Sequence, residues 1–296
     1  MRGRIARDSA ARRAGWFLAL LPGLLLSLIV LGLVLRSRPI LAIKSFGALM
    51  FSTGWHPLRG EFGFLSFIAG TVWVTLVAAV IAVPLSLLTA IYLSEYAHRR
   101  IRGLMRPLVD LLAGIPSVVF GVWGVLLVVP LIAHHVGPAF GVATTGYCVL
   151  AGDIVLAVMV FPVIIHVCTE VFQAIPQELR QASLALGATQ WQTVKHVVLR
   201  KALPGIIAAV ILGVSRVAGE TMAVLMVVGN VAKVPGSVFD PAYPLPALIA
   251  NNYGEMMSVP LYDSALLLGA LVLLVLVLVF SAAARVVLLR VERRAA

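Results

Sequence analysis

Charge is scarce in this chain: only 12% of its 296 residues are Asp, Glu, Lys or Arg, whereas 61% are hydrophobic. The mean hydropathy is +1.05. A soluble protein of this length has too little core volume to hide so much apolar surface from water. The scarcity of charge therefore excludes a soluble globular domain and predicts that lipid surrounds most of the chain.

Several motifs that carry chemistry are also missing. The two cysteines, Cys148 and Cys168, fit no metal-ligand spacing and need no disulfide. The sequence has no Gly-x-x-x-x-Gly-Lys-Ser/Thr phosphate loop, no nucleophile elbow and no zinc-type His/Glu motif. These absences argue against an enzyme. They predict that the chain needs no cofactor or metal and does not bind ATP by itself.

Six segments are long and apolar enough to cross a bilayer. Their expected ranges are 16–35, 64–93, 111–133, 146–171, 203–231 and 262–284. Five arginines precede the first span, as in a signal peptide, but its apolar run is too long for one and Arg36 stands where a small-residue cleavage site would be. We therefore expect an all-α membrane protein with six transmembrane helices and an uncleaved first span.

The net charge of +11 follows the loops. Lys and Arg cluster before span one, between spans two and three, between spans four and five, and after span six. The loop between spans three and four has neither, and the loop after span five has only Lys233. This alternation predicts that both termini are cytoplasmic. Arg36, Arg38, Lys44 and Arg59 lie on the expected outer side, but in a long loop, where charge matters less. The basic excess thus indicates topology and not nucleic-acid binding.

The largest interruption of the apolar block is the polar cytoplasmic segment from Thr169 to Gly205. Pro176 predicts the start of a helix there, since proline suits the first turn, and Gly187 predicts its end. A second helical stretch is expected over 189–199. The segment therefore predicts two short helices that protrude into the cytoplasm with a hinge at Gly187.

This segment resembles the "EAA" coupling loop of ABC importer permeases, which reads Glu-Ala-Ala, three residues, Gly, nine residues, Ile-x-Leu-Pro. The positions that fall at these spacings are Gln181, Ala182, Ser183, Gly187, Val197 and Leu199. Gln181 replaces the Glu, Ser183 replaces an Ala, and Arg200 replaces the final Pro. The resemblance implies that Gln181, Ala182, Ser183 and Gly187 form the docking site for an ATPase. The alternative is an amphipathic hairpin that lies on the membrane surface.

The stretch SRVAGETMAVLMVVGN, from Ser215 to Asn230, narrows the resemblance. It is similar to the PstC-type permeases of the bacterial phosphate importer, as are segments in 51–71, 81–95 and 111–124. The resemblance implies a type I ABC importer permease bundle with a cytoplasmic coupling-helix loop, in the bacterial inner membrane. It also implies four kinds of partner: a PstA-like sister permease, a PstB-like ATPase dimer that hydrolyses the ATP, a PstS-like periplasmic phosphate-binding protein, and membrane lipid.

On this basis the chain divides into five expected parts. Residues 1–15 form a basic cytoplasmic N-terminus, residues 16–35 the first transmembrane helix, and residues 36–63 a periplasmic loop. Residues 64–290 form the ABC permease core, with the coupling loop at about 172–202, and residues 291–296 form a cytoplasmic tail.

Two charged residues, Arg216 and Glu220, lie inside the fifth expected span, four residues apart and so on one face of a helix. An arginine at a helix centre costs about 2.5–3.5 kcal/mol on translocon scales, which calls for a reason to keep it. One reading is a pair that only holds the bundle together. The other, which the resemblance favours, is a substrate path formed by Arg216, Glu220 and Thr221. There Arg216 would attract the phosphate anion and Glu220 would hold Arg216 when the path is empty.

Three points stay open at this stage. The cargo is phosphate or another oxyanion such as molybdate or sulfate, because the chemistry of an arginine suits all of them. A self-powered carrier or a membrane scaffold is the alternative class, and the coupling loop speaks against it. The intramembrane Asp153 has three possible roles: to face the cavity, to cap a helix, or to pair with the partner permease.

Overall fold

The computed structural model describes residues 2–255 and 258–295, and the regular secondary structure in this part of the chain is helical apart from one short hairpin. Six helical segments are long and apolar enough to cross a membrane. They are Leu18–Ile43, Leu65–Tyr96, Ser117–Ala139, Val149–Ala174, Gln190–Ala218 and Tyr262–Val287. The expected all-α fold with six spans is therefore confirmed.

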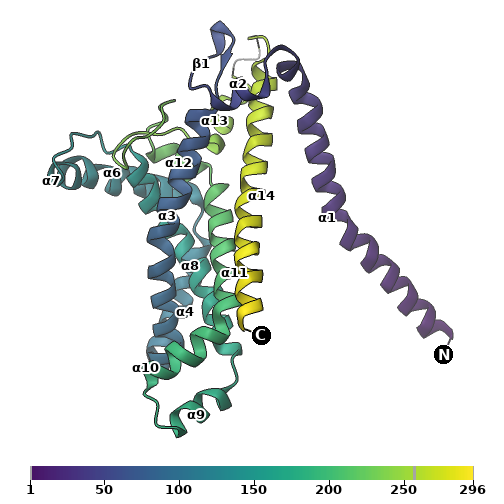
Figure 1. Cartoon of the computed structure of the whole chain (residues 1–296), viewed down its shortest axis with the longest axis vertical. Helices are drawn as coiled ribbons and strands as arrows, with labels where there is room; N and C mark the ends of the chain where they lie inside the picture. The colour runs from purple at the N-terminus through teal and green to yellow at the C-terminus, as the bar shows by residue number, and fades with distance from the viewer. Residues whose placement is uncertain (1, 256–257, 296) are drawn as a thin grey trace.

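The centre of the bundle is formed by four long helices. Helix α3 (Leu65–Ile91), which continues as the π-helical turn η2 (Tyr92–Tyr96), packs along α8 (Val149–Ala174). Helix α11 (Leu199–Ala218) lies against α8, α3 and α14 (Tyr262–Ala295), as Figure 1 shows. Small residues such as Ala78, Ala82 and Ala151 are fully buried where α3 and α8 meet. Small side chains let the backbones approach closely, which is the main source of helix packing in lipid.

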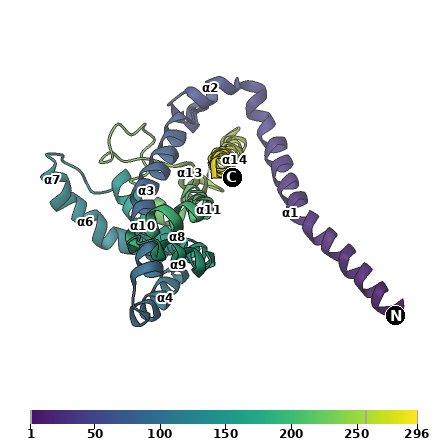
Figure 2. The same cartoon turned by 60° about the horizontal axis from the view of Figure 1, so that its bottom comes forward.

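Helix α1 (Arg2–Ile43) diverges from this bundle toward its N-terminal end (Figures 1 and 2). Among the residues of α1 whose burial is described (15, 16 and 18–43), Ser37 and Ile40 are the buried ones. The chain then forms α2 (Phe46–Phe51), β1 (Trp55–His56), η1 (Pro57–Arg59) and β2 (Glu61–Phe62). Trp55 of the hairpin packs against Phe62, Phe64, Phe67 and Tyr262. These aromatic contacts tie the loop after α1 to the starts of α3 and α14.

The third span is irregular and begins later than expected. Helix α4 (Arg99–Gly114) precedes it and ends because Ile115, the residue before Pro116, is extended with ψ 129°. The span then consists of α5 (Ser117–Trp123), η3 (Gly124–Val128), α6 (Val129–Leu131), η4 (Ile132–Val136) and α7 (Gly137–Ala139). The helix expected over 111–133 is thus divided at Pro116.

The polar segments lie at opposite ends of the bundle (Figure 1). Helices α9 (Gln177–Ala185) and α10 (Gln190–Thr193) project from the end toward which the chain's C-terminus points. The β hairpin and α13 (Leu245–Asn252) lie at the other end. This arrangement agrees with the arginine distribution, which places the first end in the cytoplasm.

Candidate functional site

The fifth membrane segment is not one helix over 203–231, and that expectation is corrected here. Helix α11 ends at Ala218, Gly219 forms a turn, and α12 (Met222–Val227) begins three residues later. The N–H of Glu220 donates to the carbonyl of Val217 at 3.1 Å, which closes the last turn of α11. Glycine is about 1 kcal/mol worse than alanine inside a helix, which favours an end at Gly219, although Gly205 and Gly213 lie inside α11 without a break.

The break separates the two charged residues that sequence spacing had placed on one helix face. A carboxylate oxygen of Glu220 accepts a hydrogen bond from the N–H of Ala223 at 3.4 Å and so caps the start of α12. The Arg216 side chain is exposed, and among the described residues it has no hydrogen-bond or ion-pair partner. Among the described residues no ion pair joins Arg216 to Glu220, and the continuous helix that the sequence spacing assumed ends between them.

Glu220 and Thr221 form a polar break beside α3. Glu220 is half-buried and borders a small crevice that Thr71 and Thr75 of α3 also line. The hydroxyl of Thr221 donates to the carbonyl of Gly219 at 3.3 Å. The break thus brings backbone groups and two polar side chains into a mostly apolar part of the bundle.

Helix α12 is held firmly after this break. The amide of Asn230 donates to the carbonyl of Leu225 at 2.7 Å, and the N–H of Ala242 donates to Val228 at 3.0 Å. Close approach to α5 depends on Gly121, where an added Cβ would lie 2.6 Å from the Met226 sulfur. The interruption between α11 and α12 is therefore built into the packing.

Asp153 lies on α8 with no exposed surface. Neither carboxylate oxygen has a hydrogen-bond partner among the described residues. Its complete burial argues against pairing with a partner permease, and the absence of a bond argues against a helix cap, which leaves a position in the bundle interior.

The first helix of the coupling segment forms where the sequence predicts it. Pro176 precedes α9, and Gly187 follows it with φ +84°, a conformation that glycine adopts without strain. Gln181, Ala182 and Gly187 are exposed, and the Leu186 side chain is 90% exposed. The half-buried Ser183 shares a hydrogen bond of 2.9 Å with Thr193. Helix α9 therefore presents small and apolar side chains on a protruding surface.

The second helix of this segment differs from the prediction. Thr189 and Gln192 form a capping box at the start of α10. Helix α10 then continues through the π-helical η5 (Val194–Val198) into α11 without interruption. The stretch expected as a separate short helix over 189–199 is the cytoplasmic end of the fifth span, because nothing after Thr189 stops the helix.

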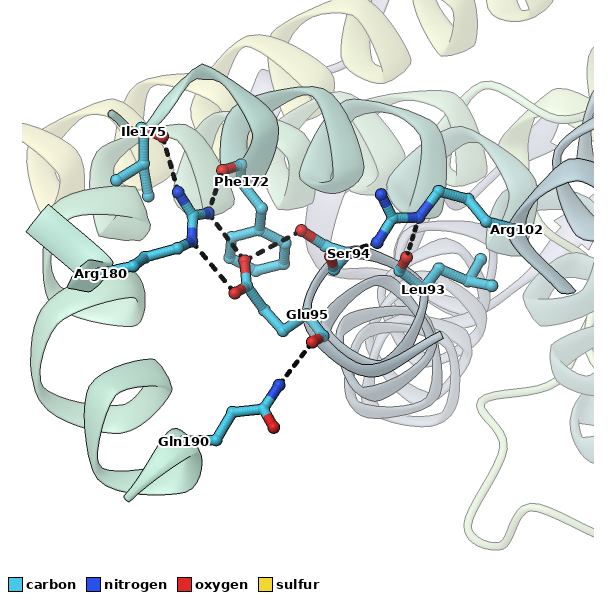
Figure 3. Close-up of polar contacts among 8 residues, drawn as sticks. All are labelled: Leu93, Ser94, Glu95, Arg102, Phe172, Ile175, Arg180 and Gln190. Carbon is cyan, nitrogen blue, oxygen red and sulfur yellow. Dashed lines mark hydrogen bonds and ion pairs between the residues drawn. The ribbon is translucent and has the colours of Figure 1, made fainter. Parts of the chain in front are cut away.

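One ion pair at this end was not predicted. The Arg180 guanidinium contacts the Glu95 carboxylate through two hydrogen bonds, Nε to Oε2 at 3.1 Å and Nη2 to Oε1 at 2.8 Å (Figure 3). The side chains are only 12% and 8% exposed. The two residues are 85 positions apart in the chain, so no local spacing marks them as partners.

Comparison with known proteins identifies the family. Residues 82–293 match the family described as "Binding-protein-dependent transport system inner membrane component". The chain belongs to this family. As a member it is the membrane-spanning permease subunit of an ABC transporter, and the ATPase is a separate subunit. It works with an ATPase and a substrate-binding protein, and the prediction that it is not itself an enzyme is confirmed.

Named relatives extend over most of the chain. The "Phosphate transport system permease protein PstC" of Xylella fastidiosa is 34% identical over 317 residues, covering 99% of this chain and 95% of that protein. The "Probable ABC transporter permease protein YqgH" of Bacillus subtilis is 39% identical, covering 77% and 73%. The "Probable phosphate transport system permease protein PstC" of Methanocaldococcus jannaschii is 33% identical, covering 80% of each.

Solved structures of ABC importers share the fold. The MetNI methionine ABC transporter matches with a TM-score of 0.58 and 21% identity, over 75% of this chain and 93% of that chain. A bacterial ABC transporter involved in the import of alginate matches with a TM-score of 0.57 and 16% identity, over 92% and 95%. The expected ABC importer permease bundle is therefore confirmed.

Proposed function

We propose that this subunit forms half of the translocation path of an inorganic phosphate importer and that Arg216 is the anion-attracting group of the path. The observation that carries the proposal is the state of Arg216. It lies near the end of an apolar helix, its side chain is exposed, and no other described residue neutralises its charge.

The cost of burying charge in lipid indicates what this arginine faces. An arginine side chain that points into hydrocarbon without a partner is costly, so intramembrane arginines usually face a bundle interior or a water-filled cavity. In a single subunit, the exposed Arg216 points out of this chain's own packing. A second permease that encloses an aqueous path with this face would remove it from lipid.

The chemistry of Arg216 suits a phosphate anion. A guanidinium presents several N–H donors in one plane, which match phosphate oxygens better than a lysine ammonium does. Without a tightly bound carboxylate, the guanidinium is free to bind an anion that passes. The relatives named as phosphate permeases support phosphate as the cargo, and molybdate or sulfate is the alternative within the same class.

The roles of Glu220 and Thr221 follow from the helix break. Glu220 is half-buried just before α12 and lies four positions after Arg216 in the chain. We assign two roles to Glu220. It shapes the path, and its negative charge weakens the binding of the anion near Arg216. Thr221 adds a hydroxyl at the same break.

The proposed partners are a PstA-like sister permease, a PstB-like ATPase dimer and a PstS-like periplasmic binding protein. Helix α9 is proposed to insert into a cleft of one ATPase copy, and the residues that contact the ATPase there are Gln181, Ala182, Ser183 and Gly187. Small residues allow close approach, and the exposed Leu186 offers an apolar contact.

Reconstitution of the four kinds of protein into liposomes tests the cargo. With ATP inside and the binding protein outside, we expect uptake of labelled phosphate that a tenfold excess of molybdate or sulfate leaves unchanged. Such a result requires that phosphate be preferred by more than roughly 1.4 kcal/mol, the free energy of a tenfold difference in affinity. Uptake of molybdate or sulfate in place of phosphate would contradict the proposed cargo. Uptake of any oxyanion without the ATPase would contradict the dependence on ATP.

A further inference from the structure

Helix α9 has few contacts of its own with the bundle. Apart from the mostly buried side chain of Arg180, its residues are exposed or half-buried, and it is connected at one end through Ile175 and Pro176 and at the other through Gly187. The hydrogen bond between Ser183 and Thr193 joins it to α10. A helix held in this way would move without carrying the membrane helices with it, unless a stronger contact connects them.

Arg180 makes that contact, because its side chain joins α9 to two other structural elements. It belongs to α9, and its guanidinium forms the two-bond ion pair with Glu95 at the end of η2. It also donates from Nη1 to the carbonyl of Ile175 and from Nη2 to the carbonyl of Phe172, both at 2.7 Å (Figure 3). These carbonyls lie at the C-terminal end of α8. One side chain thus connects α9, α8 and the extension of α3.

Local chemistry explains why this position needs an arginine. At the end of α8 the carbonyl of Phe172 accepts only a long hydrogen bond of 3.4 Å from the N–H of Ile175, and Pro176 has no N–H to donate to it. A cation at the C-terminus of a helix also interacts favourably with the helix dipole. All three guanidinium nitrogens of Arg180 are engaged, which offsets the loss of water around the buried pair.

Glu95 is fixed from its other side as well. The hydroxyl of Ser94 donates to Oε1 of Glu95 at 3.1 Å, and the Gln190 side chain donates to its backbone carbonyl at 2.6 Å. Gln190 is the first residue of α10. The end of α3 therefore contacts the chain on both sides of Gly187.

We propose that Arg180 and Glu95 are positioning residues that join α9 to α3 and α8, so that a displacement of α9 moves both membrane helices. The conformational change that the binding protein causes on the outer side reaches the ATPase through this ion pair of Arg180 and Glu95 with its hydrogen bonds, which we call the joint. The proposal rests on the proposed docking of the ATPase on α9. It assigns the transmission to the buried ion pair, whereas Gly187 sets the shape of the loop that presents α9 to the ATPase.

The test uses the complete reconstituted complex and three measurements. These are the amount of ATPase subunit that co-purifies, the ATP hydrolysis of the assembled complex without binding protein, and the increase in hydrolysis when phosphate-loaded binding protein is added. For Arg180→Gln we expect normal co-purification and normal basal hydrolysis. The stimulation by binding protein should be lost, together with uptake.

Arg180→Lys covers the case in which Arg180→Gln does not assemble. Lysine keeps a positive charge beside Glu95, so no buried carboxylate is left without a cation. Its single ammonium has three donors and cannot satisfy both carboxylate oxygens and both carbonyls at once. We expect an assembled complex with stimulation reduced severalfold. Wild-type stimulation in assembled Arg180→Lys or Arg180→Gln complexes would overturn the proposal.

Arg102→Gln is the matched control. Arg102 donates to the carbonyls of Leu93 and Ser94, on the same turn as Glu95, but it belongs to α4. We expect its stimulation to equal that of the wild type. Equal losses of stimulation in the Arg102 and Arg180 variants would mean that any change at this turn loosens the structure, and would overturn the proposal.

If the wild-type complex itself shows no stimulation by phosphate-loaded binding protein, the proposed function fails and not the role of the ion pair. If Arg180→Lys, which keeps the charge, also loses the ATPase subunit, Arg180 belongs to the docking surface, and the proposal is again overturned.

Discussion

The chain contains two arginine–glutamate combinations that differ in every physical respect. Arg180 and Glu95 are 85 positions apart, almost fully buried and joined by two hydrogen bonds. Arg216 and Glu220 are four positions apart, and the structure places no ion pair between them among the described residues. In the first combination all three guanidinium nitrogens and both carboxylate oxygens are hydrogen-bonded, whereas in the second the arginine is exposed.

This difference separates a structural ion pair from a binding group. Breaking a buried pair by removing one partner costs about 3–5 kcal/mol, because a charge is left without compensation. Such a pair holds helices together but has no capacity left for a ligand. An exposed arginine adds little to the stability of its own subunit and is available to an anion or to a neighbouring subunit.

The Arg180–Glu95 pair is expected at the cytoplasmic face of the membrane. Labelling from the two sides tests this position, and the expected difference in labelling is all or none. Single cysteines at Gln190 and Lys233, both exposed, are expected to react with an impermeant thiol reagent from opposite sides of the membrane. Gln190, beside Glu95, should react only from the cytoplasm, and Lys233 only from outside. Cys148 and Cys168 are buried and should give little background. Labelling of Gln190 from outside would refute the topology and the coupling role of α9.

The next largest effect is expected at Arg216. Arg216→Gln should reduce phosphate uptake about 100-fold, since hydrogen bonds to a charged group contribute about 1.5–3 kcal/mol. Assembly should stay normal, because the side chain is exposed and has no partner to leave behind. The measurements are uptake into liposomes and co-purification of the partner subunits. Arg216→Lys is the control, and it should retain part of the uptake. Normal uptake by Arg216→Gln would remove Arg216 from the path.

A smaller effect is expected at Gly187, which tests whether the shape of the loop matters besides the ion pair. Gly187 has φ +84°, and an added Cβ would meet no other atom. A residue with a side chain therefore suffers only from the left-handed backbone, at about 1–2 kcal/mol. A strain of about 1.4 kcal/mol corresponds to a factor of ten. Gly187→Val should therefore lower the uptake per ATP hydrolysed by about tenfold.

Gly187→Asn is the matched variant, because asparagine tolerates the left-handed region. It should keep most of the coupling. If Val and Asn behave alike, the backbone conformation of Gly187 is not what the coupling depends on.

The sequence predicts the features that depend on local composition. Apolar runs predict all six spans, and Pro176 and Gly187 predict both ends of α9, because each is caused by residues within a few positions. The family resemblance likewise depends on contiguous motifs. These parts of the fold agree with the structure because lipid and helix termini act on the chain locally.

The features that depend on tertiary contacts were not predictable in this way. The sequence from Ala218 to Asn230 stays mostly apolar although helix α11 ends at Ala218. The close packing of α12 on Gly121 and its hydrogen bond with Ala242 fix this interruption, and both contacts come from distant parts of the chain. The pairing of Arg180 with Glu95 requires the folded arrangement of α3, α8 and α9. No periodicity in one sequence contains that information.

The smallest effects are expected at Glu220, and they decide whether it acts with Arg216 or apart from it. Glu220 accepts a hydrogen bond from Ala223 at the start of α12. Glu220→Gln keeps an oxygen acceptor at that point and should lower uptake only severalfold, within about 1 kcal/mol. Glu220→Leu removes the acceptor as well and should cost more, which distinguishes the cap from the charge.

A double-mutant cycle completes this comparison. Residues without a shared contact usually have additive effects, within about 0.3–0.5 kcal/mol. Because the structure shows Arg216 and Glu220 unpaired, the effects of Arg216→Gln and Glu220→Gln on the free energy of activation for uptake should add to that accuracy. If the two form a pair in another state of the transport cycle, the double variant will deviate from additivity by more, since removing both charges leaves neither unpaired. The same cycle for Arg180→Gln and Glu95→Gln should deviate strongly from additivity when the thermal stability of the assembled complex is measured. Additive effects on stability at Arg180 and Glu95, or strong coupling at Arg216 and Glu220, would reverse the distinction between the structural pair and the binding arginine.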